Sequence, residues 1–404
     1  MNLAKRRNSI LSLPEYSLRS SESNRFTASD DELDNLRFGF FGEIGSLLSS
    51  VKRSIRDQVT ESQSELASEE LGDALWYLFG VARTLGIAPD SLGEACISTL
   101  RTRANEIAKL PAAPITFANI DGVLDSRHGQ WDITRTQQLG SIANAAGMLA
   151  ATAKEQLKAM ALPAATTYLG KIFSEWALAC SAFELRTEDV ARENLAKIAD
   201  RWPAKLSFHP LFDPESIYEE HERFPREFSI EFIERQSSTY PYVVQRLRQV
   251  NIGDRLTDNS NEPDGYRFHD IFHLAYVAYL GWSPVLRGLL KLKRKSNPVI
   301  DENQDGARAM IIEEGIATWI FNHAKDRDFY DGIKPGKLDF SLLKQIRSMV
   351  DGYEVGSCPL WQWELAILSG FEVFRELIRN KGGTVTVNMI DHTLKFIAPT
   401  DQRK

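Results

Sequence analysis

Apolar residues recur at three- and four-residue steps along much of the chain, which is the spacing of helices that bury one face. The stretches LDNLRFGFFGEIGSLLSSVKR (33–53) and SEELGDALWYLFGVARTLG (68–86) show this spacing most clearly. Ser68, followed by two glutamates, predicts the start of the second helix, and Asp90 predicts the start of a third. The segment KLPAAP (109–114) interrupts the pattern, so we expect the first helical block to end there.

The rest of the chain predicts two further blocks. Helical spacing resumes from about Thr134 to Asp200, and three prolines within 201–216 indicate a linker. Helices then alternate with loop signals, and a short strand pair is predicted near Thr384–Val387. Because alternating strand patterns are otherwise scarce, the predicted fold class is all-α. The predicted parts are a flexible, serine-rich segment at 1–30, helical bundles at 31–110 and 111–205, and a mainly helical C-terminal domain at 206–404.

Charge and cysteine usage narrow the class of protein. The chain has 404 residues and a formal net charge of −7, which argues against dedicated nucleic-acid binding. Its three cysteines lie far apart and form no CxxC pair, as is typical of a reducing compartment. No apolar run has the length of a membrane span, and the basic start of the chain lacks the apolar core of a signal peptide. We therefore expect a cytoplasmic protein without a membrane partner.

Three carboxylates in the first helical block are candidate metal ligands. Glu70 and Asp73 lie three residues apart and so share one helix face, and Glu43 lies on the preceding helix. If the two helices pack together, the three acids can surround one magnesium ion, which prefers oxygen ligands. Helix carboxylates usually face solvent, which is the simpler interpretation. The apolar surroundings of these three favour a site.

These residues carry a resemblance to a known family. GEIGSLLSSVKR followed by EELGDALWYLFGVARTLGI resembles the MazG-type all-α nucleotide pyrophosphohydrolases. The resemblance implies hydrolysis of nucleoside triphosphates to monophosphate and pyrophosphate with Mg²⁺, or with Mn²⁺ in its place. It assigns the metal and the catalysis to Glu43, Glu70 and Asp73. Gly42 and Ser46 stand where the family pattern has further glutamates, which puts the number of metal ions and the activity in question.

The second helical block aligns with the first as a degenerate copy. NAAGMLAATAK (144–154) matches GEIGSLLSSVK, and YLGKIFSEWALAC (168–180) matches ELGDALWYLFGVA. In this alignment a lysine replaces Asp73 and no metal ligand survives. ENLAKIADRWP resembles the family's closing helix, which implies that Asn194, Lys197 and Arg201 lie near the nucleotide. We therefore predict a composite site, with the metal on copy one and nucleotide contacts from copy two; the alternative is that copy two is scaffold only.

The last block contains a second cluster of potential ligands. His269, Asp270 and His273 fall within one helical stretch, and Glu313 and Glu314 lie in the apolar helix IIEEGIATWIFNHA. Such a set from two helices can bind a transition metal or magnesium and support catalysis there. The layout resembles a more distant MazG-like module. A buried histidine with a purely structural role is the alternative for each single position.

Basic residues lie between those two helices. Lys293, Arg294 and Lys295 are either a solvated basic face or contacts for the phosphates of a nucleotide. The stretch DENQDG (301–306) resembles the start of a calcium-binding EF-hand loop, but Ile312 stands where the closing glutamate is needed, so we do not expect calcium there.

Three functions are compatible with this sequence. The first is metal-dependent hydrolysis of a nucleotide substrate by a homo-oligomeric enzyme. The second is a non-catalytic nucleotide or metal sensor, because Ser46 leaves the first cluster one acid short. The third is a phosphohydrolase whose active site is the C-terminal His/Asp/Glu cluster.

Overall fold

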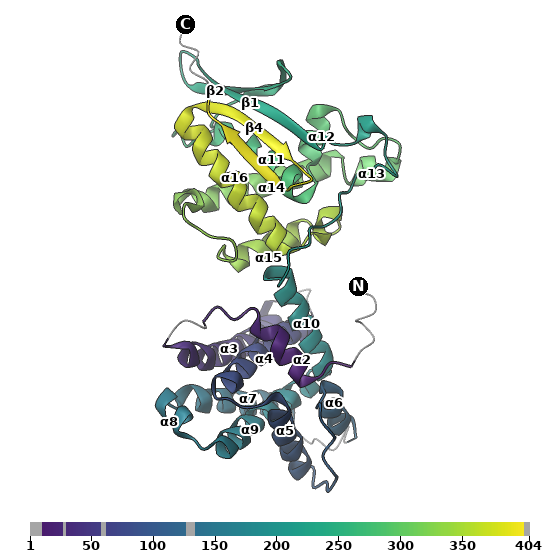
Figure 1. Cartoon of the computed structure of the whole chain (residues 1–404), viewed down its shortest axis with the longest axis vertical. Helices are drawn as coiled ribbons and strands as arrows, with labels where there is room; N and C mark the ends of the chain where they lie inside the picture. Colours follow the sequence, from purple (N-terminus) through teal and green to yellow (C-terminus); the bar gives the residue numbers. More distant parts are fainter. Residues whose placement is uncertain (1–9, 27–29, 58–61, 127–133, 400–404) are drawn as a thin grey trace. The chain divides into compact units, whose positions relative to one another are not determined.

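The chain folds into two compact units, Met1–Ala199 and Asp200–Lys404 (Figure 1). A computed structural model describes residues 10–26, 30–57, 62–126 and 134–399. The two predicted helical copies share the first unit and one hydrophobic core. Among the described residues, no helix combines the length and the apolar character that crossing a membrane requires.

The described residues of the first unit form helices joined by loops, with a single isolated β-bridge between Ser12 and Thr116 and no β-strand. Each predicted copy supplies two longer helices and one closing helix: α3, α4 and α5 in the first, and α7, α9 and α10 in the second. The helices are α2 (Leu13–Ser21), α3 (Glu32–Asp57), α4 (Gln63–Thr84), α5 (Pro89–Arg103), α6 (Phe117–Asp125), α7 (Arg135–Ala151), α8 (Lys154–Ala159), α9 (Leu162–Ala182) and α10 (Thr187–Arg201).

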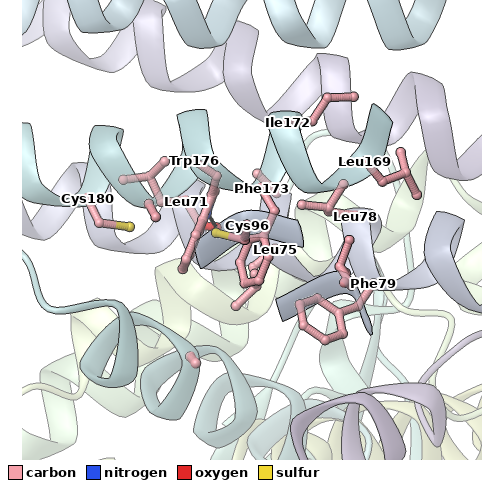
Figure 2. Packing of buried hydrophobic residues seen from close by; sticks show 14 of the residues in the cluster. Leu71, Leu75, Leu78, Phe79, Cys96, Leu169, Ile172, Phe173, Trp176 and Cys180 are labelled. Carbon is pink, nitrogen blue, oxygen red and sulfur yellow. Dashed lines mark hydrogen bonds between the residues drawn. The ribbon is translucent and has the colours of Figure 1, made fainter. Parts of the chain in front are cut away.

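The centre of the first unit is the contact between α4 and α9 (Figure 2). Leu71 and Leu75 on α4 lie beside Phe173 and Trp176 on α9, and all four side chains are fully buried. The indole N–H of Trp176 donates to the backbone carbonyl of Leu71 at 2.8 Å. Each such side chain contributes roughly 1.5–3 kcal/mol on burial, so this contact fixes α4 and the acids it carries.

The segment predicted to be flexible contains an ordered helix. Ser12 caps α2 by accepting from the backbone N–H of Glu15 at 3.2 Å, and Leu13 and Tyr16 are fully buried. The prediction of a flexible segment is wrong for α2. The serine content of the segment suggests disorder, but the S-x-x-E pattern from Ser12 to Glu15 is a helix-capping signal. Residues 1–9 and 27–29 of that segment lie outside the described residues.

Two predicted helix starts also shift. α4 begins at Gln63, where Ser62 and Glu65 form a capping box, and therefore starts before Ser68. Asp90 does not cap its helix, because α5 begins one residue earlier, at Pro89. The Asp90 carboxylate instead accepts from the backbone N–H of Ile115 at 2.8 Å.

The second unit corrects the all-α prediction, since it combines helices with a five-stranded sheet of order β3-β2-β1-β4-β5. All paired neighbours in this sheet are antiparallel. The strands are β1 (Glu227–Gln236), β2 (Pro241–Leu247), β3 (Val250–Leu256), β4 (Gly382–Asn388) and β5 (Thr393–Ile397). The longer helices are α11 (Asp270–Leu280), α14 (Ala307–Lys325), α15 (Phe340–Met349) and α16 (Leu360–Asn380), with α12 (Pro284–Leu290) and α13 (Pro298–Asn303) between α11 and α14.

The sheet brings together strands from both ends of the second unit. Phe228, Ile230 and Phe232 alternate along β1 and are buried, and Ile230 pairs with Val385 of β4. Helices α11 and α16 pack against β4 and β5, as Figure 1 shows. The strand pair predicted near Thr384–Val387 is confirmed as part of β4 and β5.

Candidate functional site

The three predicted carboxylates of the first unit lie near one another on α3 and α4. Glu43 hydrogen-bonds with Glu70, and Ser50 on α3 donates to Glu70 Oε1 at 3.4 Å. Burial of Glu43, together with the negative charges of Asp73 and Glu70, raises the pKa of Glu43 to about 7. The positive charge of Lys197 opposes this shift. Near neutral pH, Glu43 therefore holds a proton that an incoming cation can displace.

This raised pKa makes stability depend on pH. Without metal, the Glu43 carboxyl titrates near 4.5 in the unfolded chain and at about 7 in the folded chain, so the folded state keeps the proton longer. The unfolding free energy that Glu43 contributes therefore falls as pH rises between these values. In chelator, we expect Glu43→Gln to gain about 1–3 kcal/mol over the natural chain between pH 5 and pH 8. Urea unfolding at each pH measures this gain, and a difference that stays constant with pH contradicts it.

Lys197 of α10 lies against the acids of α4. Its Nζ donates to Asp73 Oδ2 at 2.5 Å and to Glu69 Oε1 at 2.9 Å. Burial alone would lower the pKa of Lys197, but Asp73 and Glu69 raise it above its usual value. The lysine is therefore a charged ammonium group at the carboxylate cluster, and it comes from the closing helix of the predicted second copy.

A buried hydrogen-bond chain fixes the other oxygen of Asp73. Tyr16 on α2 donates to Asn194 Oδ1 at 2.8 Å, and Asn194 Nδ2 donates to Asp73 Oδ1 at 3.2 Å. α10 reaches this position because Gly72 leaves room: a Cβ there would lie 3.1 Å from the Cβ of Asn194. Sequence reasoning missed Tyr16, which the capping pattern of α2 could have placed on an ordered helix.

The predicted nucleotide contact Arg201 belongs to the second unit. It is fully buried and forms an ion pair with Glu364, and its Nη2 donates to the carbonyl of Leu338 at 2.6 Å. All three of these residues lie in the second unit, so Arg201 contributes to the packing there. The prediction for Arg201 is therefore corrected, whereas Asn194 and Lys197 lie beside Asp73.

The carboxylate cluster has enough acids to bind a hard divalent cation, but its oxygens are not gathered around one point. Within the described ranges, Glu43, Glu70 and Asp73 do not bring three ligand oxygens within 4.8 Å of one another. Magnesium needs only one or two protein carboxylates, however, because water and substrate phosphates fill its other positions. Glu70 and Asp73, about one turn apart on α4, supply such carboxylates.

The second predicted cluster lies in the second unit, between α11 and α14. His269, His273 and Glu314 offer ligand atoms that all lie within 4.8 Å of one another. Asp270 Oδ1 lies 3.1 Å from His269 Nε2, and its other oxygen accepts from Gln245 at 2.5 Å. These residues therefore lie together, as the sequence predicts.

Glu313 lies behind this cluster. Its carboxylate is fully buried, and it accepts from His273 Nδ1 at 2.7 Å and from the backbone N–H of Val285 at 2.8 Å. Burial alone would lower the pKa of His273, but Glu313 and Glu314 raise it well above its usual value. Glu313 therefore orients His273 and has both oxygens engaged.

The three basic residues between α12 and α13 differ in burial. Arg294 is fully buried and paired with Asp305 and Glu354, which corrects its prediction as a phosphate contact. Lys295 is exposed and Lys293 is partly exposed, so both remain accessible to an anion. Asp305, which lies in the stretch that resembles an EF-hand loop, serves this buried ion pair instead.

Comparison with known protein families gives a match over the second unit. Residues 207–400, a little under half of the chain, match the family model of the MazG C-terminal domain. The second unit is therefore similar to the C-terminal domain of MazG proteins. No curated protein and no solved structure matches the chain.

Proposed function

We propose that the first unit hydrolyses nucleoside triphosphates to monophosphate and pyrophosphate in the presence of Mg²⁺, or of Mn²⁺ in its place. One observation carries this proposal: Asp73, which lies near Glu43 and Glu70, pairs with the cationic Lys197 from another helix. The MazG-family match of the second unit supports the reaction type. The proposal adds the location of the site, the metal and the substrate.

The charges in the cluster suit this reaction. Glu70 and Asp73 would hold a magnesium ion, which would supply a Lewis acid to polarise a phosphate oxygen. Glu43 has a pKa of about 7 in the metal-free protein, which suits a group that accepts the proton of an attacking water near neutral pH. The water oxygen bonds to the α-phosphorus, the bridging P–O bond breaks, and its electron pair leaves with pyrophosphate.

We expect the ammonium group of Lys197 to contact acids in the free protein and a phosphate oxygen in the substrate complex. Without substrate its ammonium group neutralises Asp73 and Glu69. When a cation binds the acids, the same ammonium group becomes available to a phosphate oxygen, where positive charge stabilises the transferring group. Copy two therefore contributes a substrate contact although it lacks the acids of copy one.

Replacing Lys197 by methionine tests this composite site. We expect kcat/KM for the nucleotide to fall about 10- to 100-fold, because one charge contact in the transition state is lost. The matched control is Lys171→Met, since Lys171 is an exposed lysine of α9 in the same unit. Steady-state kinetics that are unchanged in Lys197→Met would show that copy two is only scaffold.

The direct test of the reaction is product identification. The purified chain is incubated with a panel of ribo- and deoxynucleoside triphosphates and Mg²⁺ or Mn²⁺, and the products are resolved by chromatography. The proposal predicts monophosphate and pyrophosphate in equal amounts. Diphosphate with inorganic phosphate would contradict the assigned bond cleavage.

A nucleotide sensor is the second candidate. The ion pair between Lys197 and Asp73 favours it, because the lysine neutralises one acid without any metal. This function predicts nucleotide binding, measured by calorimetry, without product formation in either metal. The same panel therefore separates the two functions.

A further inference from the structure

We propose that His269, His273 and Glu314 form a binding site for a divalent transition-metal ion of the zinc class in the second unit. The site is separate from the carboxylate cluster and does not depend on the function proposed above. Two helices build it: His269 and His273 lie one turn apart at the start of α11, and Glu314 lies on α14. This donor set of two imidazoles and one carboxylate is typical of zinc and related metals.

The spacing of the three donors fits one ion. His273 Nε2 lies 3.5 Å from Glu314 Oε1, and His269 Nε2 lies 3.9 Å from Glu314 Oε2. Two ligands of a tetrahedral metal with bonds near 2.1 Å are about 3.4 Å apart, so small side-chain rotations bring the donors into place. Glu314 has a partly exposed side chain, which leaves a route for the ion from solvent.

Both histidines already present the correct nitrogen. His269 Nδ1 lies 2.9 Å from the carbonyl oxygen of Tyr266, and His273 Nδ1 lies 2.7 Å from Glu313 Oε1. Both Nε2 atoms face Glu314. A metal ion would displace the Nε2 proton that the raised pKa of His273 favours, and each imidazole would then donate from Nδ1 and offer its lone pair from Nε2. Metal-bound histidines are typically oriented in this way by a carbonyl or carboxylate behind them.

Two further observations point to a ligand. His273 is fully buried, and its Nε2 has no close hydrogen bond among the described residues, since Glu314 Oε1 lies 3.5 Å away. A buried polar atom without a partner is costly, and a metal ion removes that cost. The carboxylates of Asp270, Glu313 and Glu314 also surround the two imidazoles, so a divalent cation balances the local charge.

The stacking of Tyr266 on His269 adds rigidity to the site. The two rings are parallel within 1° with centroids 4.2 Å apart, and the Tyr266 hydroxyl lies 2.7 Å from Thr318 Oγ1 of α14. Because the imidazole is held in place before metal binding, little side-chain entropy is lost when the ion enters.

Nitrogen donors disfavour magnesium at this site, since that ion prefers oxygen ligands.

The test is metal binding to the full chain after removal of metals with a chelator. Zn²⁺ is titrated by calorimetry, bound zinc is counted by elemental analysis, and Co²⁺ is added in a parallel sample for its visible absorption. We expect one zinc equivalent in this site and a cobalt spectrum with nitrogen ligands. In His269→Gln and in Glu314→Gln, zinc affinity is expected to fall at least 100-fold and the cobalt band to disappear.

Two controls decide where the ion binds. His323→Gln changes a histidine of α14 that hydrogen-bonds with Tyr330, outside the cluster, and should leave both signals unchanged. Glu70→Gln reports on binding in the first unit. If zinc does not bind, or if Glu70→Gln removes it while Glu314→Gln keeps it, the proposed site is overturned.

Discussion

Replacing Arg294 by methionine is expected to lower the free energy of unfolding of the second unit by about 3–5 kcal/mol, because breaking a buried ion pair strands its partners. The guanidinium N–H groups of Arg294 donate to Asp305, to Glu354 and to the carbonyl of Phe212. Its side chain is fully buried. Without it, the buried Asp305 and the partly buried Glu354 lose their main cationic partner.

Lys295→Met is the matched control, since it removes an exposed positive charge one residue away. We expect a change within about 0.5 kcal/mol for this surface substitution. Urea unfolding of both variants, followed by circular dichroism, measures the difference. Equal stability of the two variants would contradict the structural role of Arg294.

The helices and the grouping of the acids could be predicted from local patterns. The apolar spacing of 33–53 and 68–86 is a property of each helix alone, and Glu70 and Asp73 share a face by that same spacing. The position of Lys197 beside Asp73 follows from the composite-site prediction, which depends on the resemblance of ENLAKIADRWP to the family's closing helix. Local spacing does not place residues so far apart in sequence beside each other. Whether this proximity serves catalysis remains a prediction.

Other features depend on contacts that local patterns do not contain. The alternation of Phe228, Ile230 and Phe232 was present in the sequence, but its partner strand β4 lies far away in the chain. Arg201 and Arg294 are predicted from the sequence as nucleotide and phosphate contacts, because charge alone does not reveal burial. Each has buried acidic partners, and only the folded chain brings these together.

Glu70→Gln is the substitution with the largest expected effect on activity. The amide keeps nearly the same size and can still accept from Ser50, so the packing of α4 should persist. It removes one negative charge from the cluster that we propose to hold the cation. We therefore expect kcat/KM to fall at least about 100-fold, as is common when electrostatic stabilisation of the transition state is lost.

The matched control is Glu94→Gln, which removes a partly exposed carboxylate on α5 of the same unit. A parallel variant, His269→Gln, changes the cluster of the second unit. Glu94→Gln removes one acid from the first unit, as Glu70→Gln does, so the two variants differ only in which acid is lost. The parallel variant tests the alternative active site.

The most direct measurement is the rate of pyrophosphate release from a nucleoside triphosphate with Mg²⁺, compared among these three variants and the natural chain. We expect Glu70→Gln to lower the rate of release at least about 100-fold, whereas Glu94→Gln and His269→Gln retain it. Release that survives in Glu70→Gln but is lost in His269→Gln would contradict the account and assign the reaction to the second unit.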